Sequence, residues 1–532
     1  MVTVAVLLFA VLVGLLTSVV PGVTAVGLFH SLFKDPLSQF AVSPHDPPEG
    51  SKPAPDDETW DIRYHLGGNS PWIPKVSGTV EGGIEPPAGC VVDQVHMLSR
   101  HAERYPTTLA GIRMLELYQH IQKANTTLKG ELAFANDWDF FMSDPSARLE
   151  NLVSTGPYAG TLEAFATGVK LRTRYEHLLD QALARNQTSF WASGSKRVVE
   201  TAGYFGAGFF GLVWKQLASL HVISETEDRG GDTLTAGKTC LKYLHNADEY
   251  GRAYGYRKWN KWREVYLPAI VERLSKRNPE ITFSQDEVYS MQELCGFELI
   301  AKGKSQWCDV FTRGEWEQFE YARDVLHFYR TGPGNPYSGT TGWLWLNATA
   351  NILLERPAEA GPLFFSLYVP ASLTAQHTHT LANSHFSASV HDGDIIPMLT
   401  ALNLLPPQTP RLPTSDLLSN RTFRTSDLVP MGGRIILERL ACPAPQGCWD
   451  KAEYGYPHMR YCEPVGKEHY FVRVNVNDGI VALPGCDGGP GRSCPLGEFA
   501  ERVARRGKEV GEFREVCGLP RDAKGGIEFL HQ

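Results

Sequence analysis

The chain has 532 residues and a formal net charge of −8 at pH 7, and 42% of its residues are hydrophobic. At about 150 residues a domain, such a chain can bury a large core, either as about three domains or as one large fold with an inserted lobe. The sequence pI is 6.1 and no long Lys/Arg run occurs, which excludes the electrostatic footprint of a nucleic-acid-binding protein. Any anion-binding role must therefore be local.

Residues 1–25 are predicted to be a signal peptide. They form an apolar, uncharged run interrupted at Pro21, and the small residues Val23 and Ala25 are placed as they are at a cleavage site. The run lacks a basic region at its start, so an uncleaved signal anchor is the alternative. No stable membrane partner is expected unless the leader stays uncleaved. Residues 26–59 are polar and rich in proline, which is typical of a spacer.

The cysteines and the glycosylation sequons also point to export. Ten cysteines are dispersed without any CxxC pair, so they favour disulfides over a metal site, and "CPAPQGC" and "CDGGPGRSC" read as short loops closed by bridges. Four acceptor sequons agree with a glycosylating route and begin at Asn125, Asn186, Asn347 and Asn420. We therefore predict a secreted protein, extracellular or in the cell wall.

From about residue 60 to 520 the chain alternates short apolar runs with segments of helical period, which predicts an α/β or α+β architecture. Residues 240–360 read as mostly helical, for example "WREVYLPAIVERLSK" and "GEWEQFEYARDVLHFYR". This region is expected to form a separate helical lobe.

The first candidate for a functional loop follows a predicted strand, "CVVDQVHMLS". The loop begins "RHAERYP" and carries Arg100, His101 and Arg104 close together. A helix N-terminus is predicted directly after it, and both the orphan amides and the helix dipole favour an anion at that place.

The helix predicted after this loop is "TTLAGIRMLELYQHIQKA". Its apolar side is expected to carry Ile112, Leu115 and Ile121, and Thr107 or Thr108 is available as the cap.

A second loop lies in "SFWASGSKRVVETAGYFGAGFFG", which predicts a strand, a Ser/Gly turn and a helix. One face of this helix is expected to carry Val198, Ala202, Phe205 and Phe209. Arg197 occupies the first turn, where a cation opposes the helix dipole unless an anion is bound there. A solvated arginine is the alternative.

A third loop lies in "HFSASVHDGDIIPMLTALNLL", where a strand-like run leads to His391 and Asp392. A helix is predicted next, with Asp394 as its cap and Pro397 in its first turn. Its buried stripe is expected to hold Ile395, Leu399 and Leu402. His391 and Asp392 can also be read as ordinary turn and cap residues.

Taken together, the loops point to one pocket, because ligands of α/β sheets bind beyond the carboxyl ends of the strands. The pocket would hold three guanidiniums, two imidazoles and one carboxyl group, which suits phosphoryl transfer without a metal or other cofactor. Guanidiniums bind phosphate oxygens in fork geometry and offset charge in the transition state. One imidazole can attack phosphorus, and a protonated carboxylic acid can donate to the leaving oxygen.

Two of these segments resemble the signatures of a known family. "RHAERYPT" resembles the RHGxRxP signature of the histidine acid phosphatases, and "HDGDIIP" resembles their HD signature. Further similarity to secreted fungal acid phosphatases and phytases is carried by "LGGNSPW", "STGPYAG", "ASGSKRVVETAGYFGAGFFG", "GPGNP", "VPMGGRIILERLAC" and "YFVRVNVNDGIVALPGC". The similarity covers nearly all of residues 60–520.

The resemblance implies an α/β fold, with a mixed sheet flanked by helices and a smaller inserted helical domain drawn mainly from residues 110–185 and 240–360. It implies that His101 is the nucleophile, which forms a phosphohistidine, and that Asp392 donates a proton to the leaving alcohol. The phosphate would be bound by Arg100, Arg104, Arg197 and His391. The guanidiniums would disfavour protonation of His101 and keep its ring nitrogen available.

The resemblance also implies the disulfide pairs Cys90–Cys462, Cys240–Cys517, Cys295–Cys308 and Cys486–Cys494. Cys442 and Cys448 would then pair with each other.

The sequence departs from the family in two places. Ala102 stands where the family usually has glycine, and a methyl group there would cost affinity or rate if positive φ or close backbone approach to the phosphate is required. Residues 367–389 are an atypical insert, read as a dispensable surface loop or as translated intron sequence. Because of it, either "PLFFS" or "HFSASV" is the strand before His391. The histidines of the insert are not predicted to bind metal.

We predict a secreted, glycosylated, metal-independent phosphomonoesterase that acts on small-molecule phosphate monoesters at acid pH. Broad acid phosphatase activity is the first reading and phytase activity the second. A phosphate-binding homologue with weakened catalysis is a further alternative, and a phosphohistidine mutase is disfavoured by the leader, cysteines and sequons. The sequence is compatible with a monomer and with a homo-oligomer.

Overall fold

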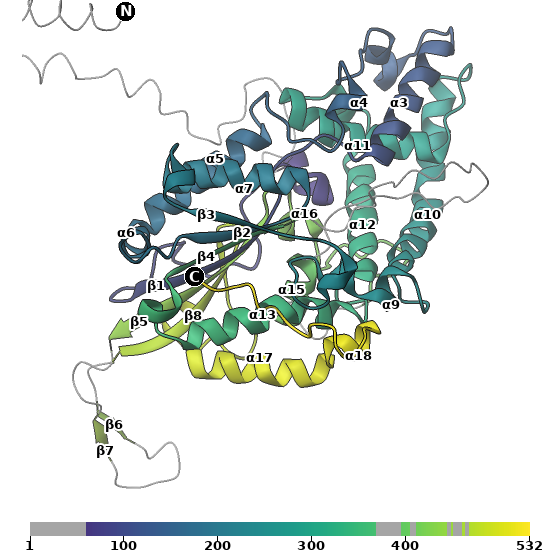
Figure 1. Ribbon diagram of the computed structural model, residues 1–532. Coiled ribbons are helices and arrows are strands. Elements are labelled where there is room, and N and C mark those ends of the chain that lie inside the picture. The colour runs from purple at the N-terminus through teal and green to yellow at the C-terminus, as the bar shows by residue number, and fades with distance from the viewer. Residues whose placement is uncertain (1–59, 369–394, 405–410, 444–447, 451–459, 463–467) are drawn as a thin grey trace, which may run out of the picture. The chain divides into compact units, whose positions relative to one another are not determined.

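Figure 1 shows the computed structural model, which describes residues 60–368, 395–404, 411–443, 448–450, 460–462 and 468–532. The predicted leader and spacer lie outside these residues, as do His391, Asp392 and Asp394. Within the described part of the chain, no helix has the length and apolar character needed to cross a membrane.

The described residues form an eight-stranded mixed sheet with the order β10-β8-β5-β1-β4-β2-β3, and β9 pairs with β8. Its strands are β1 (Val91–Arg100), β2 (Ser189–Ser193), β3 (Ser219–Ile223), β4 (Leu363–Tyr368), β5 (Arg434–Pro443), β8 (Glu468–Val476), β9 (Gly479–Val481) and β10 (Cys494–Pro495). A separate two-stranded ladder joins β6 (Cys448–Asp450) to β7 (Arg460–Cys462).

β1 lies between β4, which runs parallel to it, and β5, which runs antiparallel. Its burial is nearly continuous, as expected for a strand with neighbours on both edges and helices on its faces. β4 begins at Leu363 and its last residue, Tyr368, pairs with Arg100. The segment "PLFFS" is therefore a strand of the sheet, whereas "HFSASV" lies outside the described residues.

Helices cover both faces of the sheet, as the resemblance implies (Figure 1). One face carries α5 (Gly160–Arg174), α6 (Glu176–Arg185) and α7 (Lys196–Phe210). The other carries α13 (Ser338–Leu354) and α17 (Leu496–Val510). The apolar core on the first face joins strand residues such as Phe365 to helix residues that include Val198, Ala202, Phe205 and Phe209, which confirms the predicted buried face of α7.

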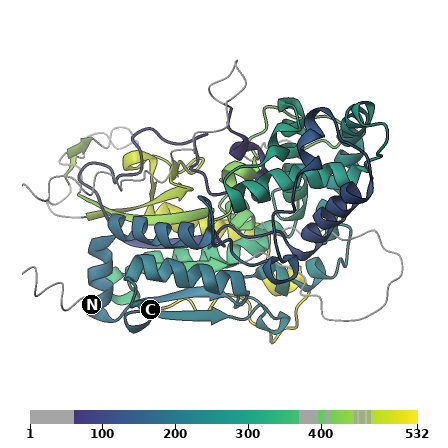
Figure 2. The same cartoon turned by 90° about the horizontal axis from the view of Figure 1, so that it is seen from above.

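The predicted helical region of residues 240–360 is confirmed as a set of helices. Its long members are α10 (Ala253–Arg277), α11 (Gln285–Lys302), α12 (Arg313–Arg330) and α13. Capping boxes begin two of them, with Ser284 and Glu287 at α11 and Thr312 and Glu315 at α12. Figures 1 and 2 show α10, α11 and α12 grouped with α3 (Thr108–Lys123), away from the strands. That they constitute a separate lobe stays a prediction.

The remaining helices are short. They are α4 (Pro145–Arg148), α8 (Ala236–Thr239), α9 (Leu241–Leu244), α14 (Pro357–Ala360), α15 (Ile395–Ala401), α16 (Thr425–Leu428) and α18 (Phe513–Cys517). Ile395 and Leu399 of α15 and Leu402 just after it are buried, as predicted. All seven residues of α15 are buried, however, so the helix does not have a single buried stripe.

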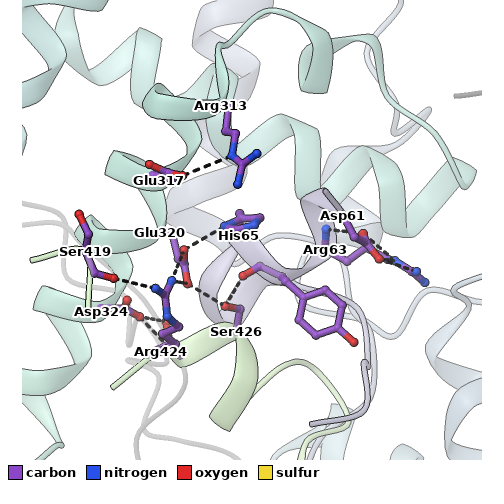
Figure 3. Close-up of polar contacts among 12 residues, drawn as sticks. Asp61, Arg63, His65, Arg313, Glu317, Glu320, Asp324, Ser419, Arg424 and Ser426 are labelled. Atoms are coloured by element: carbon purple, nitrogen blue, oxygen red, sulfur yellow. Dashed lines mark hydrogen bonds and ion pairs between the residues drawn. The ribbon is translucent and has the colours of Figure 1, made fainter. Parts of the chain in front are cut away.

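A buried ion-pair network joins α12 to two distant segments (Figure 3). The Glu320 carboxylate accepts hydrogen bonds from His65, in the 3-10 turn η1 (Ile62–His65), and from Arg424, just before α16, each at 3.0 Å. One turn further along α12, Asp324 accepts from Arg421 Nε at 2.6 Å. Buried charges are tolerated when they are paired in this way. The network fixes the turn that precedes "GGNSPW", a segment that contacts the candidate site.

The α3 helix buries a different side from the one predicted. Its buried side chains are those of Met114, Leu117 and Ile121, with Ala110 and Gly111 in the first turn, whereas Ile112 is exposed and Leu115 is half-buried. The observed stripe shares Ile121 with the predicted one but is otherwise rotated about the helix axis, because α3 packs against α11.

The described disulfides correct two of the predicted pairs. Cys90 is bonded to Cys442, so the predicted Cys90–Cys462 and Cys442–Cys448 pairs are wrong. The reason is the antiparallel ladder of β1 and β5, in which Val91 opposes Ala441 and thereby brings the neighbouring cysteines together. The other predicted pairs are confirmed, namely Cys240–Cys517, Cys295–Cys308 and Cys486–Cys494.

Candidate active site

The sheet brings two of the three candidate loops to one edge. β1, β4 and β2 are parallel neighbours, so their carboxyl ends lie on the same side of the sheet. His101 directly follows β1, and Arg197 lies in the first turn of α7, which begins shortly after β2 ends at Ser193. The carboxyl ends of parallel strands are where α/β sheets bind ligands.

His101 is fully buried, and its hydrogen bonds define which ring nitrogen is available. Nδ1 lies 2.7 Å from the carbonyl oxygen of Ala102, which can only accept, so Nδ1 carries the proton. Nε2 then keeps its lone pair and accepts from Arg104 Nε at 3.3 Å. Burial and the guanidiniums of Arg100, Arg104 and Arg197 hold the pKa of His101 well below its usual range. The imidazole is therefore neutral and nucleophilic at Nε2.

Arg100 is held by two backbone carbonyl groups from distant parts of the chain. Its Nη1 donates to Gly68 O at 2.7 Å and to Val429 O at 2.6 Å. Gly68 belongs to "LGGNSPW" and Val429 to "VPMGG", segments that the sequence analysis used only as marks of resemblance. Backbone acceptors carry no side-chain signature, so this role of the two segments could not be predicted from the sequence.

Arg104 contacts the imidazole of His101 through its Nε. Besides the bond to His101, its Nη1 donates to the carbonyl oxygen of Tyr105 at 2.9 Å. Its guanidinium carbon lies 6.0 Å from the centre of the Phe297 ring in α11. α11 thus contributes an aromatic side chain that lies near Arg104.

Arg197 is 5% exposed, which excludes the solvated alternative. Its Nη1 donates to Glu150 Oε2 at 3.1 Å. In the described part of the chain, its Nε and Nη2 have no hydrogen-bond partner. Burial lowers the pKa of Arg197, and the carboxylates of Glu150 and Glu225 act in the opposite direction. A buried guanidinium with an open donor edge is suited to an anionic ligand.

Glu150 was not found from the sequence. Besides Arg197, its carboxylate accepts from the backbone N–H of Thr108 at 3.2 Å, in the first residue of α3. Thr107, one of the two residues predicted as the cap of α3, is its N-cap residue. Its side chain makes no capping hydrogen bond to the helix. An acid from another segment therefore occupies the helix N-terminus that was expected to receive a ligand anion.

The backbone at Ala102 does not need glycine. Ala102 is absent from the set of described residues with positive φ, and its backbone N–H donates to Thr201 Oγ1 at 3.2 Å. Its methyl group is buried in an apolar cluster with Leu152 and Ala164. Ala102 in place of the family's glycine was expected to cost activity if this position required positive φ or close backbone approach to the phosphate. The first condition does not hold, because Ala102 does not have positive φ.

Glu103 is a second acid that the sequence analysis missed. It is 1% exposed, and its Oε1 accepts from the backbone N–H of Trp72 at 2.7 Å, in the "LGGNSPW" segment. Burial and the neighbouring Glu163 carboxylate raise the pKa of Glu103 to about 8. At acid and neutral pH this side chain is a neutral carboxylic acid that links the loop of the nucleophile to the preceding segment.

The remaining predicted site residues cannot be placed beside these. His391 and Asp392 lie outside the described residues, as do residues 369–389 of the insert with all three of its histidines. Within the described ranges, no cluster of three or more His, Cys, Asp and Glu side chains could hold a metal ion.

A neutral buried imidazole among three guanidiniums, at the carboxyl ends of parallel strands, defines a class of α/β enzyme that handles phosphate groups. The model of the histidine phosphatase superfamily (branch 2) matches residues 91–477, and the chain belongs to this family. The resemblance to histidine acid phosphatases is thereby confirmed.

Similar proteins are acid phosphatases and phytases. An acid phosphatase of Komagataella pastoris is 32% identical over 90% of this chain and 91% of its own length. A phytase of Candida albicans is 30% identical over 87% of this chain and 88% of its own length. The crystal structure of the phytase from D. castellii has 28% sequence identity and a TM-score of 0.73, and covers 92% of this chain and 94% of that chain. These matches confirm the predicted mixed sheet flanked by helices, and the chain is a phosphoric monoester hydrolase.

Proposed function

We propose that the chain is an acid phosphatase that hydrolyses phosphate monoesters through a phosphohistidine on His101. The observation that carries the proposal is the state of His101, which is buried and proton-free at Nε2 and lies within the field of three guanidiniums. Such an imidazole can act as a nucleophile towards a phosphate ester that the guanidiniums bind. The guanidiniums supply the charge that a phosphoryl transition state needs, so no metal or cofactor is part of the proposal.

In the first step, His101 Nε2 forms a bond to phosphorus while the bond from phosphorus to the ester oxygen breaks. Asp392, in its protonated form, gives its proton to that oxygen, and the alcohol leaves. In the second step, water attacks phosphorus, its proton passes to Asp392, and the bond to Nε2 breaks to release phosphate. Arg100, Arg104 and Arg197, together with His391, bind the phosphate oxygens throughout.

Activity at acid pH follows from this division of roles. A carboxyl group ordinarily has a pKa near 4, so Asp392 can donate only in an acid medium. His101 keeps its lone pair under the same conditions because its own pKa is held well below the usual range. The neutral nucleophile and the protonated acid therefore coexist at acid pH.

Broad acid phosphatase activity is the first candidate, and phytase activity the second. The second is favoured by the likeness to the D. castellii phytase over most of both chains. We further propose that the protein is exported by its leader, residues 1–25, and acts outside the cell. The four described disulfides support an oxidising environment.

The test is release of phosphate from p-nitrophenyl phosphate and from phytate, between about pH 2.5 and about pH 6, with EDTA present. We expect the wild type to be active and His101→Ala to be inactive at unchanged thermal stability. The ratio of the two rates decides between broad phosphatase and phytase. If folded wild-type protein is inactive on both substrates, the proposal fails and a phosphate-binding homologue with weakened catalysis is left.

A further inference from the structure

Glu150 has an unusual backbone. It lies between α4 and α5, and its φ of 66° places it in the left-handed region although it is not glycine. A side chain makes this conformation costly, and it persists where the surroundings enforce it, often near functional sites. Here the Glu150 backbone N–H donates to the carbonyl oxygen of Pro106 at 2.9 Å, next to the loop of the nucleophile.

The side chain of Glu150 joins two elements of the candidate site. Oε1 accepts from the backbone N–H and from the hydroxyl of Thr108, each at 3.2 Å, at the start of α3. Oε2 accepts from Arg197 Nη1 at 3.1 Å, at the start of α7. The carboxylate therefore ties Arg197 to the segment that follows the nucleophile, over 47 residues of sequence.

This contact uses only one part of the guanidinium. Nε and Nη2 form the opposite edge of Arg197, and in the described residues neither has a partner although both are buried. Two parallel N–H donors on one edge match two oxygens of a phosphate group. A carboxylate at Nη1 and a phosphate at Nε and Nη2 can thus be bound together, so Glu150 does not have to leave when substrate binds.

We propose that Glu150 is a positioning residue, which holds Arg197 so that its Nε and Nη2 edge binds the phosphate group next to His101. The inference rests on the proposed function and names one further residue of its site. Without the carboxylate, Arg197 is free to adopt other rotamers, and ordering it costs part of the phosphate-binding energy. Phosphate affinity falls in consequence, together with the rate.

The test compares Glu150→Gly with the wild type. Glycine accepts positive φ without strain, so this variant removes the carboxylate and relieves the backbone at the same time. We expect the Ki of inorganic phosphate and the KM of p-nitrophenyl phosphate to rise about 10-fold, as for loss of one hydrogen bond to a charged group. Glu150→Gln keeps one acceptor oxygen, so its Ki and KM are expected to lie between those of the wild type and those of Glu150→Gly.

Two comparisons separate positioning from a structural effect. Arg197→Ala should raise Ki further, and the double variant should equal Arg197→Ala alone, because Glu150 acts through Arg197. Glu200→Ala is the matched control on the same helix, since Glu200 pairs with Lys196 and not with Arg197. It should leave Ki and KM unchanged.

The inference is overturned if Glu150→Gly leaves Ki unchanged or lowers it, or if it raises Ki by the same factor in the Arg197→Ala background. These outcomes are distinct from failure of the proposed function, which His101→Ala reports through activity alone. If Glu150→Gly does not fold, Glu150→Gln replaces it in the comparison with Arg197→Ala and the double variant. Additive effects of the two substitutions on Ki then overturn the inference.

Discussion

The methyl group of Ala102 belongs to the apolar packing beside the nucleophile. Ala102 is 1% exposed and clusters with Leu152 and Ala164. Its own backbone N–H donates to Thr201 Oγ1. We therefore expect Ala102→Gly to destabilise the protein by about 1 kcal/mol, through lost packing and greater freedom of the unfolded chain. kcat/KM for p-nitrophenyl phosphate should change less than about two-fold, because no strain is relieved.

Thermal unfolding and initial rates at acid pH check this expectation. A several-fold gain in kcat/KM, at any change in stability, would show that the methyl group obstructs phosphate and would restore the expectation drawn from the family signature.

The site residues that could be predicted from the sequence have reactive or charged side chains that lie within a short motif. Arg100, His101 and Arg104 are adjacent in the chain, and the dipole argument for Arg197 needs only its own helix. Glu150 could not be predicted, because its role arises from contact with Arg197, 47 residues away. Assignment of the Cys90 partner failed for a similar reason, since it depended on which strands pair.

At the scale of elements, the crossing of α5 and α7 positions Arg197, and two glycines allow it. A Cβ on Gly208 of α7 would meet the Phe165 carbonyl oxygen of α5 at 2.1 Å, and a Cβ on Gly168 would meet the Phe205 carbonyl oxygen at 2.3 Å. Both obstacles are backbone atoms, which cannot rotate away. A Cβ on Gly203, on the same helix, would lie 4.0 Å from the side chain of Trp214, so this position has room for a methyl group.

We expect Gly208→Ala to separate α7 from α5, to cost about 1–3 kcal/mol and to lower kcat/KM, since Arg197 moves with the helix. Gly203→Ala should stabilise the protein by up to about 1 kcal/mol through helix propensity and leave the kinetics unchanged. Denaturant unfolding and the KM of p-nitrophenyl phosphate for both variants test the pair. Equal stability of the two variants would contradict the close-packing argument.

Helices and strands were predicted well where the apolar residues of a segment follow a single spacing. β1 is buried almost continuously because strands flank it on both sides, although its sequence includes Asp93, Gln94 and His96. α7 shows a single apolar face because it packs on the sheet. The buried side of α3 was predicted correctly at Ile121 but wrongly at Ile112 and Leu115, because the apolar residues of its sequence are spread around the helix. Which of them are buried depends on α11, a partner that local periodicity cannot identify.

At the scale of the whole molecule, burial distinguishes the glycosylation sequons. Asn125, Asn186 and Asn420 are exposed, whereas Asn347 is half-buried within α13, which packs against α15 and α17. Asn347 is therefore less accessible to a glycosylating enzyme than the other three asparagines. We therefore expect glycopeptide mass spectrometry of the exported, active protein to find glycans at the three exposed sites and none at Asn347. Occupancy of Asn347 in active protein would contradict this.

Buried groups whose pKa values are shifted in opposite directions contribute to the pH dependence of stability. The pKa of Glu103 is raised from 4.5 to about 8, so the folded state holds its proton more tightly than the unfolded state and stability falls as pH rises from about 4.5 to about 8. Burial lowers the pKa of His96 from 6.5 to about 3, so stability falls as pH drops from about 6.5 to about 3. His101 acts in the same direction as His96.

These two trends overlap between about pH 4.5 and about pH 6.5, where we expect the melting temperature to be highest. Melting curves across acid and alkaline pH test this with two variants. Glu103→Gln keeps an acceptor for the Trp72 N–H and should flatten only the alkaline limb. His96→Phe keeps the stacking on Phe364, whose ring lies 4.4 Å away, and should flatten only the acid limb. If Glu103→Gln leaves the slope of the melting temperature between about pH 5 and about pH 8 unchanged, the raised pKa of Glu103 is contradicted.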